Sequence, residues 1–218
     1  MLKSYVRRAG HFTDAQKKAY EESACKYVIP FSENFVNYAQ IFGGSGGVTM
    51  EIGFGMGLAT AEIAEANPGK NYIGIEVHRP GIGRLLWEME KRNLSNIRII
   101  EYDAVPAARK MIAPHSLDAV HIFFPDPWPK KKHNKRRLVQ RPFTETLAEC
   151  LKLDGYLYMV TDWEDYAQFA LLELQSTPGL RNAYSDFSGR QSWRPKTKFE
   201  NKGLAKDHVI RELFFVKS

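Results

Sequence analysis

The residues best suited to chemistry stand in a short segment, Pro125-Asp126-Pro127-Trp128. This segment follows residues 118–124, whose composition predicts a buried strand. A proline on each side of Asp126 restricts the backbone and fixes the direction of its carboxylate. The ring of Trp128 offers a face on which a nucleic-acid base can stack. The structural alternative is a proline-rich turn with Trp128 packed in the core.

A strongly basic stretch follows directly. Residues 130–141 hold seven Lys or Arg and no Asp or Glu. The whole chain has 31 Lys and Arg against 25 Asp and Glu, so the charges outside this stretch nearly cancel. Such a stretch is either a solvated loop or a surface that binds phosphates without reading sequence. Because it adjoins Asp126 and Trp128, we favour the second interpretation and a site that modifies nucleic acid.

A glycine-rich turn, Glu51-Ile52-Gly53-Phe54-Gly55-Met56-Gly57, closes the predicted strand 48–52. Glycines permit a tight turn and let a ligand approach the bare backbone. The dinucleotide-binding pattern G-x-G-x-x-G would need a third glycine where the chain has Leu58. The turn therefore argues against a dehydrogenase-type site, although a purely structural turn stays possible.

Acidic residues stand at the ends of three successive predicted strands. They are Glu51, Glu76 at the end of strand 71–76, and Asp103 after strand 97–102. At such strand ends Glu76 can accept hydrogen bonds from ribose hydroxyls and Asp103 from an adenine amino group. Each acid alone could instead cap a helix or end a loop. Together they would repel phosphates, which favours the cationic S-adenosylmethionine over NAD or ATP.

The elements that position these residues alternate along the chain. Besides the strands above, we expect strands 155–161 and 209–216, and helices 14–24, 58–66, 83–93, 142–153 and 164–175. This alternation predicts an α/β fold, with a mostly parallel central sheet, helices on both faces and a closing strand near the C-terminus. Residues 1–35 show no strand pattern and read as a basic extension, either flexible and RNA-contacting or a solvated tail.

Composition narrows the class of protein. Hydrophobic residues make up 44% of the chain and charged residues 26%, which is typical of a globular protein. No run is apolar enough for a membrane helix, and no secretory signal is evident. Cys25 and Cys150 are far apart, and His78, His121 and His133 form no metal-binding pattern. We therefore expect a cytoplasmic protein without membrane or metal partner; the sequence leaves its oligomeric state undetermined.

The segment from Pro125 to Arg137 resembles the signature of the bacterial tRNA (guanine-N7-)-methyltransferase family. Shorter matches span the chain in order: Ser4-Tyr5-Val6-Arg7-Arg8, Glu51-Ile52-Gly53-Phe54-Gly55, Gly74-Ile75-Glu76-Val77, Thr161-Asp162-Trp163 and Thr197-Lys198-Phe199-Glu200. The resemblance implies a Rossmann-like class I methyltransferase fold with an antiparallel closing strand, in one domain over residues 1–218. It also implies methyl transfer from S-adenosylmethionine to N7 of a guanine in the variable loop of tRNA.

The same resemblance implies a role for each matching residue. It makes Asp126 catalytic and places these residues in the cofactor site: Glu51, Gly53, Gly55, Gly57, Glu76, Asp103, Ala104 and Asp126. It assigns to the guanosine Lys130, Asp162, Thr197, Lys198, Phe199 and Glu200. It assigns to the RNA backbone Lys132, His133, Asn134, Lys135, Arg136 and Arg137.

Guanine N7 carries a lone pair and no proton, so the reaction needs no general base. Asp126 could stabilise the positive charge that methylation leaves on the base. Asp162 or Glu200 could accept hydrogen bonds from the guanine N1–H and amino group. Two alternatives stay open: an amino-group methyltransferase, because Asp-Pro-Trp resembles the Asp-Pro-Pro-Tyr type of loop, and a tRNA-binding protein without catalytic activity.

Overall fold

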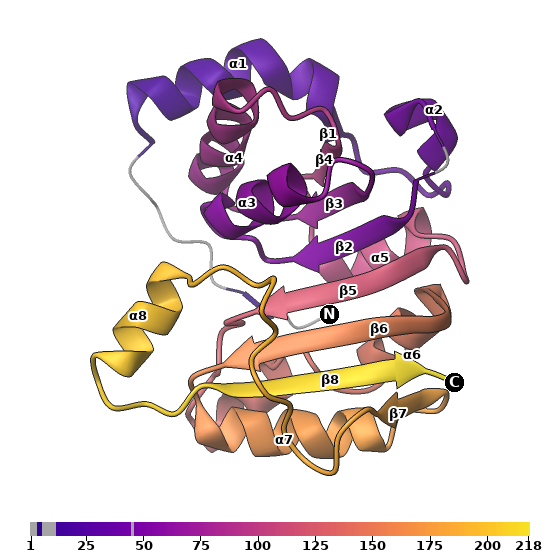
Figure 1. Ribbon diagram of the computed structural model, residues 1–218, viewed down its shortest axis with the longest axis vertical. Coiled ribbons are helices and arrows are strands. Elements are labelled where there is room, and N and C mark those ends of the chain that lie inside the picture. The colour runs from indigo at the N-terminus through magenta and orange to yellow at the C-terminus, as the bar shows by residue number, and fades with distance from the viewer. Residues whose placement is uncertain (1–3, 6–11, 45) are drawn as a thin grey trace. The chain divides into compact units, whose positions relative to one another are not determined.

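The computed structural model describes residues 4–5, 12–44 and 46–218 (Figure 1). The chain divides into two compact units. One unit spans residues 7–113, and the other comprises residues 114–218 together with residues 1–6.

The described part of unit 7–113 holds four parallel strands. They are β1 (Val28–Ile29), β2 (Val48–Ile52), β3 (Asn71–Ile75) and β4 (Ile97–Ile100), in the order β1-β4-β3-β2. The helices are α1 (Asp14–Tyr27), α2 (Tyr38–Phe42), α3 (Leu58–Ala66), α4 (Arg79–Lys91) and α5 (Ala104–Met111). In the view of Figure 1, α3 and α4 lie in front of these strands and α5 lies behind them. The predicted α/β alternation is therefore present in this unit.

The predicted strand 48–52 and helix 58–66 match β2 and α3 residue for residue. All five residues of β2 are buried, as expected of a strand inside a parallel sheet. Helix α4 begins at Arg79, four residues before the predicted start at Gly83, because Pro80 is compatible with a first helical turn. Helix α5 was not predicted.

The prediction that residues 1–35 contain no strand was wrong at Val28–Ile29, which pair with Ile99 and Ile100 of β4. A two-residue strand is too short to show a periodic pattern. Helix α1 is present, and Thr13 caps it: the Thr13 hydroxyl accepts from Gln16 N at 3.3 Å, and the Gln16 side chain accepts from Thr13 N at 3.0 Å. The predicted basic arm falls largely on residues 1–3 and 6–11, which lie outside the described residues.

Unit 114–218 holds a mixed set of strands. Strands β5 (Leu117–Phe123) and β6 (Leu151–Thr161) are parallel, and β8 (Arg211–Lys217) runs antiparallel to β6 and to β7 (Leu180–Asn182). The helical elements are η1 (Lys131–Arg136, a 3-10 helix), α6 (Phe143–Cys150), α7 (Glu164–Gln175) and α8 (Lys198–Leu204). The antiparallel closing strand is thus confirmed. The predicted helix 142–153 ends early, because Leu151 already pairs with Leu117 in the sheet.

The two faces of these strands are covered differently. Figure 1 shows α6 and α7 behind β6 and β8, whereas the chain between β7 and α8 crosses in front of them. Trp193 in this crossing segment packs against β5 and β6, with its ring 4.9 Å from the His121 ring and 5.6 Å from the Tyr158 ring. Trp193 therefore packs the C-terminal segment onto the strands, while 38% of its surface stays exposed.

We expect the Gly83→Ala substitution in α4 to destabilise the protein. Alanine normally stabilises a helix relative to glycine by about 1 kcal/mol. Here a Cβ atom would lie 2.4 Å from the carbonyl oxygen of Gln16 in α1 and 2.8 Å from the ring of Phe12, just before α1. Overpacking should prevail, with a net loss of about 1 to 3 kcal/mol in urea unfolding. Glu90→Ala on the exposed side of α4 is the control, and equal stability of both variants would contradict the close packing.

Candidate active site

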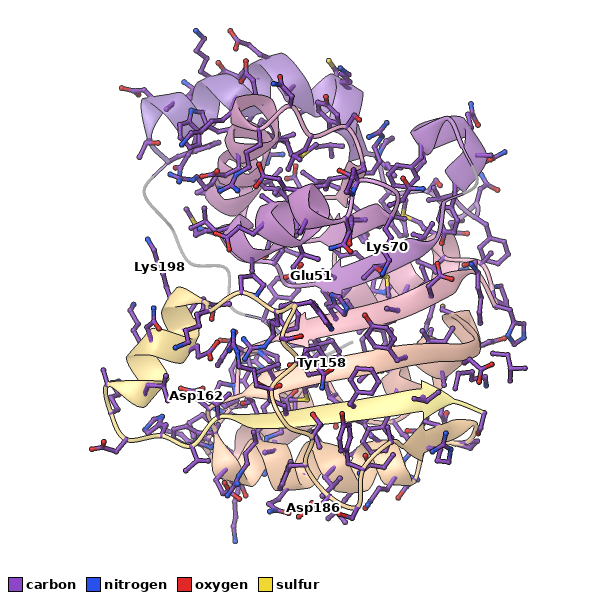
Figure 2. All side chains as sticks on the ribbon, in the orientation of Figure 1. Glu51, Lys70, Tyr158, Asp162, Asp186 and Lys198 are labelled. Atoms are coloured by element: carbon purple, nitrogen blue, oxygen red, sulfur yellow. The ribbon has the colours of Figure 1, made fainter. Side chains whose placement is uncertain are left out.

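The acids and glycines assigned to the cofactor gather at the carboxyl ends of β2, β3 and β4. Glu51 is the penultimate residue of β2, Glu76 directly follows β3, and Asp103 lies three residues beyond β4. These strands are parallel neighbours, so their carboxyl ends lie at one edge of the sheet. Figure 2 labels Glu51 at the end of β2. The structure therefore brings together the three acids that the sequence pattern singled out.

The glycine-rich turn after β2 is open on one side and closed on the other. Gly53 and Gly55 have left-handed φ values of 73° and 58°, and a Cβ atom on either would meet no atom within 4 Å. By contrast, a Cβ atom on Gly81 of α4 would lie 1.9 Å from the Gly55 carbonyl oxygen. Helix α4 therefore supports the turn from behind, and the open side leaves its backbone accessible to a ligand. Gly57 begins α3 as its N-cap.

Glu76 is held by backbone N–H groups. Its Oε2 accepts from Gly55 N at 2.8 Å, and its Oε1 accepts from Val77 N at 2.7 Å and His78 N at 3.1 Å. Burial raises the pKa of Glu76, and these three bonds oppose the rise. A carboxylate has about four acceptor sites, so about one remains. If Glu76 accepts hydrogen bonds from both ribose hydroxyls, as the sequence predicts, one of its three hydrogen bonds from backbone N–H groups must break.

Glu51 and Asp103 occupy different environments. Glu51 is only 4% exposed, and burial together with the nearby Glu76 charge raises its pKa to about 7. Asp103 is partly exposed, and its Oδ1 accepts from Val105 N at 3.0 Å as the N-cap of α5. Asp103 therefore caps a helix, which is the structural alternative considered from sequence. This hydrogen bond uses one of its two carboxylate oxygens. Ala104, the first residue of α5, is buried.

The Asp126 segment lies between two strained aromatic residues. Phe124 and Trp128 have φ values of 50° and 47°, a left-handed conformation that non-glycine residues rarely adopt. Asp126 is exposed, and its loop directly follows β5. Phe124 keeps its N–H bonded to the Val160 carbonyl at 2.8 Å. The chain thus turns sharply after β5 and presents Asp126 to solvent.

The expectation that Trp128 offers an open face for a base was wrong. Trp128 is 9% exposed, and its indole Nε1 donates to the Ser4 carbonyl at 3.0 Å. The guanidinium carbon of Arg136 lies 4.5 Å from the centre of the ring, and His133 packs against its edge. Trp128 therefore anchors the loop, which is the structural alternative considered from sequence.

Most of the basic segment is available to a polyanion. Lys130, Lys132 and Lys135 are exposed, whereas His133, Asn134 and Arg136 are partly exposed. Partial desolvation and the charges of Lys132 and Arg136 lower the pKa of His133, so it is neutral near pH 7. Residues 131–136 of the segment fold as the 3-10 helix η1.

Arg137 is the exception among the residues assigned to the RNA backbone. It is 2% exposed, its Nε donates to the Pro127 carbonyl at 3.0 Å, and it forms an ion pair with Asp165. Its guanidinium also lies over the Tyr166 and Phe169 rings, at 5.0 and 4.9 Å. The guanidinium is thus engaged within the protein, where it fixes the residue that follows Asp126.

Asp162 lines a cavity of about 400 Å³ in unit 114–218. The other lining residues are Trp163, Glu164, Asp165, His208 and Val209. The Asp162 carboxylate is partly exposed and lies 3.3 Å from His208 Nδ1. Asp162 can therefore meet a ligand that enters this cavity.

The assigned run 197–200 forms the start of α8. The Thr197 hydroxyl caps the helix by accepting from Glu200 N at 3.1 Å, and Lys198 and Phe199 point to solvent, Phe199 being 57% exposed. Figure 2 shows Lys198 projecting from α8. Glu200 is 4% exposed and forms ion pairs with Arg190 and Arg194.

Sequence reasoning missed the buried network behind Glu200. Arg194 bonds Glu212 at 2.8 Å and the Tyr158 hydroxyl at 3.1 Å, and Tyr158 also bonds Glu212. These partners are far apart in the chain, so no local pattern links them. Both Glu200 oxygens are engaged, one by Arg190 and one by Arg194. Of the two acids considered for the guanine edge, Asp162 is the one that lines a cavity.

Comparison with known proteins gives the family. Residues 45–213 match the model of a family described as "Putative methyltransferase". The tRNA (guanine-N(7)-)-methyltransferase of Nitrosomonas eutropha is 49% identical to the chain over 217 residues, covering 100% of the chain and 97% of the relative. The corresponding protein of Nitrosomonas europaea is 48% identical with the same coverage. This chain belongs to the tRNA (guanine-N7)-methyltransferase family.

Solved structures agree with this family assignment at the level of the fold. The 16S rRNA methyltransferase KamB matches with a TM-score of 0.61 at 11% identity, over 100% of both chains. An antibiotic-related methyltransferase matches with a TM-score of 0.57 at 18% identity, over 85% of this chain and 96% of that one. The predicted Rossmann-like class I methyltransferase fold is confirmed.

None of the helices in the described part of the chain is long and apolar enough to cross a membrane. Within the same residues, no three His, Cys, Asp or Glu side chains group so that they could hold a metal ion.

The raised pKa of Glu51 predicts a pH-dependent stability. The ordinary pKa is 4.5 and the folded value is about 7, so the folded state binds the extra proton between these values. The unfolding free energy should therefore fall by about 3 kcal/mol as pH rises through this range. Glu51→Gln should remove the fall, measured by denaturant unfolding near pH 5 and near pH 8. Glu62→Gln on the exposed side of α3 should retain it; an unchanged pH dependence in Glu51→Gln would contradict the assignment.

The difference between Arg137 and Lys135 can be tested directly. Arg137→Ala leaves a cavity beside two aromatic rings and frees the Pro127 carbonyl, so we expect a loss of about 2 to 4 kcal/mol in thermal or urea unfolding. Lys135→Ala removes an exposed charge and should change stability by less than about 0.5 kcal/mol. If Arg137→Ala were as stable as Lys135→Ala, the anchoring role would be wrong.

Proposed function

We propose that this chain transfers a methyl group from S-adenosylmethionine to N7 of a guanine in the variable loop of cytoplasmic tRNA. Residues 1–218 would act as one methyltransferase domain. The observation that carries the proposal is the exposed Asp126 carboxylate, fixed by the anchors of Pro127 and Trp128 and followed at once by the exposed lysines of η1. The names of the relatives support guanine as the base and N7 as the atom that takes the methyl group.

The edge of the sheet in unit 7–113 suits S-adenosylmethionine, which supplies a methyl group bonded to a positively charged sulfur. Gly53 and Gly55 present an open backbone face beside the acids. Glu76 retains capacity for a ribose hydroxyl, and Asp103 retains the oxygen that does not cap α5. Carboxylates favour a cation here and oppose the phosphates of ATP or NAD.

The residues of the chain need only bind, orient and stabilise charge. The N7 lone pair of guanine takes the methyl group directly, so no side chain removes a proton. The purine ring gains a positive charge, which the Asp126 carboxylate stabilises. Alignment of the base with the methyl donor supplies much of the remaining rate enhancement.

In this proposal Asp162 selects guanine over adenine. Its partly exposed carboxylate can accept from the guanine N1–H and amino group, which adenine does not offer in this pattern. The exposed Phe199 ring offers a face on which the base can stack. The exposed Lys130 and Lys198 side chains supply positive charge. Glu200 acts through its arginine pairs, which hold the start of α8 in place.

The proposal is tested with purified protein, unmodified tRNA and S-adenosylmethionine labelled in the methyl group. Label should enter tRNA and appear as N7-methylguanosine, which makes the RNA chain cleavable in alkali. An N6-methyladenine product would support the amino-group alternative, and binding without label transfer would support the non-catalytic one. Neither alternative is favoured by the names of the relatives.

Asp126→Ala should separate catalysis from binding. Turnover should fall by about 100-fold or more, because charge stabilisation in the transition state is lost, while the Kd for tRNA changes little. Replacing Lys131, Lys132 and Lys135 together by Ala should instead weaken tRNA binding and flatten its salt dependence. Turnover at saturating tRNA should persist in that triple variant. Equal loss of tRNA binding in both proteins would contradict this division of roles.

A further inference from the structure

Helix α8 carries a second basic row. Lys198 and Lys202 stand four residues apart in the helix, and Lys206 follows after four more. The backbone N–H of Lys206 donates to the Gly203 carbonyl in the turn after the helix. All three side chains are exposed. Residues four apart share one face of a helix and are separated by about 6 Å along its axis. Lys198 and Lys202 therefore present two charges about one helical turn apart, and Lys206 adds a third just beyond the end of the helix.

The opposite side of α8 is packed against its own unit. Glu200 is buried in its pairs with Arg190 and Arg194, and a Cβ atom on Gly203 would lie 3.0 Å from Asp162. These two inward positions leave Lys198 and Lys202 on the outward side of the helix. Figure 1 shows α8 at the margin of the strands β6 and β8, and Figure 2 shows Lys198 directed away from them.

The charge of this region is not compensated locally. Residues 190–208 contain six Lys or Arg and two Asp or Glu. One of the acids, Glu200, is already neutralised by two arginines. Among the described residues, none of Lys196, Lys198, Lys202 and Lys206 has an ion-pair partner within 4.0 Å. The other acids near this region are Asp207, the half-buried Asp162 beside His208, and Glu164 and Asp165 of the same cavity, which pair with Arg211 and Arg137.

We propose that Lys202 and Lys206 of this row, together with the exposed Lys196 just before α8, bind the phosphate backbone of the nucleotides that flank the target guanosine; Lys198 of the row is assigned to the guanosine itself. This rests on the proposed function, since the tRNA substrate supplies that backbone. Asp162 touches α8 at Gly203, and Phe199 lies at the start of the helix, so a nucleotide held by these residues has its neighbours along α8. The exposed Phe199 and Leu204 side chains, 57% and 47% accessible, interleave with the lysines and suit contact with RNA.

The row is separate in sequence and element from η1. The Lys131–Arg136 turn follows β5, whereas α8 precedes β8. Each set contributes its own phosphate contacts, and each contact adds to the salt dependence of binding. The two sets of basic residues can therefore be substituted one at a time. The change in the salt dependence of tRNA binding then gives the number of phosphate contacts that each set makes.

The test measures the Kd for unmodified tRNA by fluorescence anisotropy over a range of KCl concentrations. The variant combines Lys196→Ala, Lys202→Ala and Lys206→Ala. The slope of log K against log salt should shrink in magnitude by about 2 to 3, with a Kd at least about tenfold higher near physiological salt. Turnover at saturating tRNA should stay within about twofold of the wild type. The corresponding Lys→Arg triple should restore the slope.

The matched control combines Lys70→Ala, Lys91→Ala and Lys110→Ala, three exposed lysines of unit 7–113. It removes the same net charge and should leave the slope unchanged. Equal slopes in the two triple variants, or no tRNA binding by the wild type, would overturn the inference. A wild-type protein that binds tRNA through α8 but transfers no label would overturn the proposed function and leave this inference standing.

Discussion

One buried guanidinium does much to hold the exposed Asp126 in place. Two aromatic residues in the left-handed region, Phe124 and Trp128, bracket the segment, at a cost of about 1 to 3 kcal/mol each. The bond from Arg137 to the Pro127 carbonyl and the indole bond of Trp128 to Ser4 offset this cost. A carboxylate that must meet a developing charge thereby stays in water yet keeps a defined direction.

The acids of the protein differ in role because they differ in surroundings. Glu51 is buried and has a pKa of about 7, whereas the buried Glu200 is paired with two arginines. Glu76 lies between these cases, with backbone N–H groups opposing the effect of burial on its pKa. A cationic ligand near Glu51 would favour its ionised form, so binding of the methyl donor and proton release should be linked.

Local patterns predicted the elements but not the burial of single side chains. Helices 58–66 and 164–175 agree with the structure because each spans more than two helical turns, and strand 48–52 agrees because a glycine ends it directly. Strand β1 has two residues, and helix α8 has seven, too few to show a period. Arg137 and Lys135 stand in one basic run, and only tertiary contacts with Asp165 and Tyr166 distinguish them. The burial of Trp128 likewise depends on tertiary contacts that the local sequence does not reveal.

Charge counts taken from the sequence conceal the basic character of α8. Outside residues 130–141 the charges nearly cancel over the whole chain, so the local excess of Lys and Arg in residues 190–208 does not show in that sum. The structure also shows acids that are buried in pairs with arginines, which take acid and base alike out of the surface charge: Glu88 with Arg84 and Arg92, and Glu200 and Glu212 with Arg194. Such pairs contribute little field at the surface, because each acid is neutralised where it stands. The potential that an RNA meets is set by the lysines left without partners, and these include the row on α8.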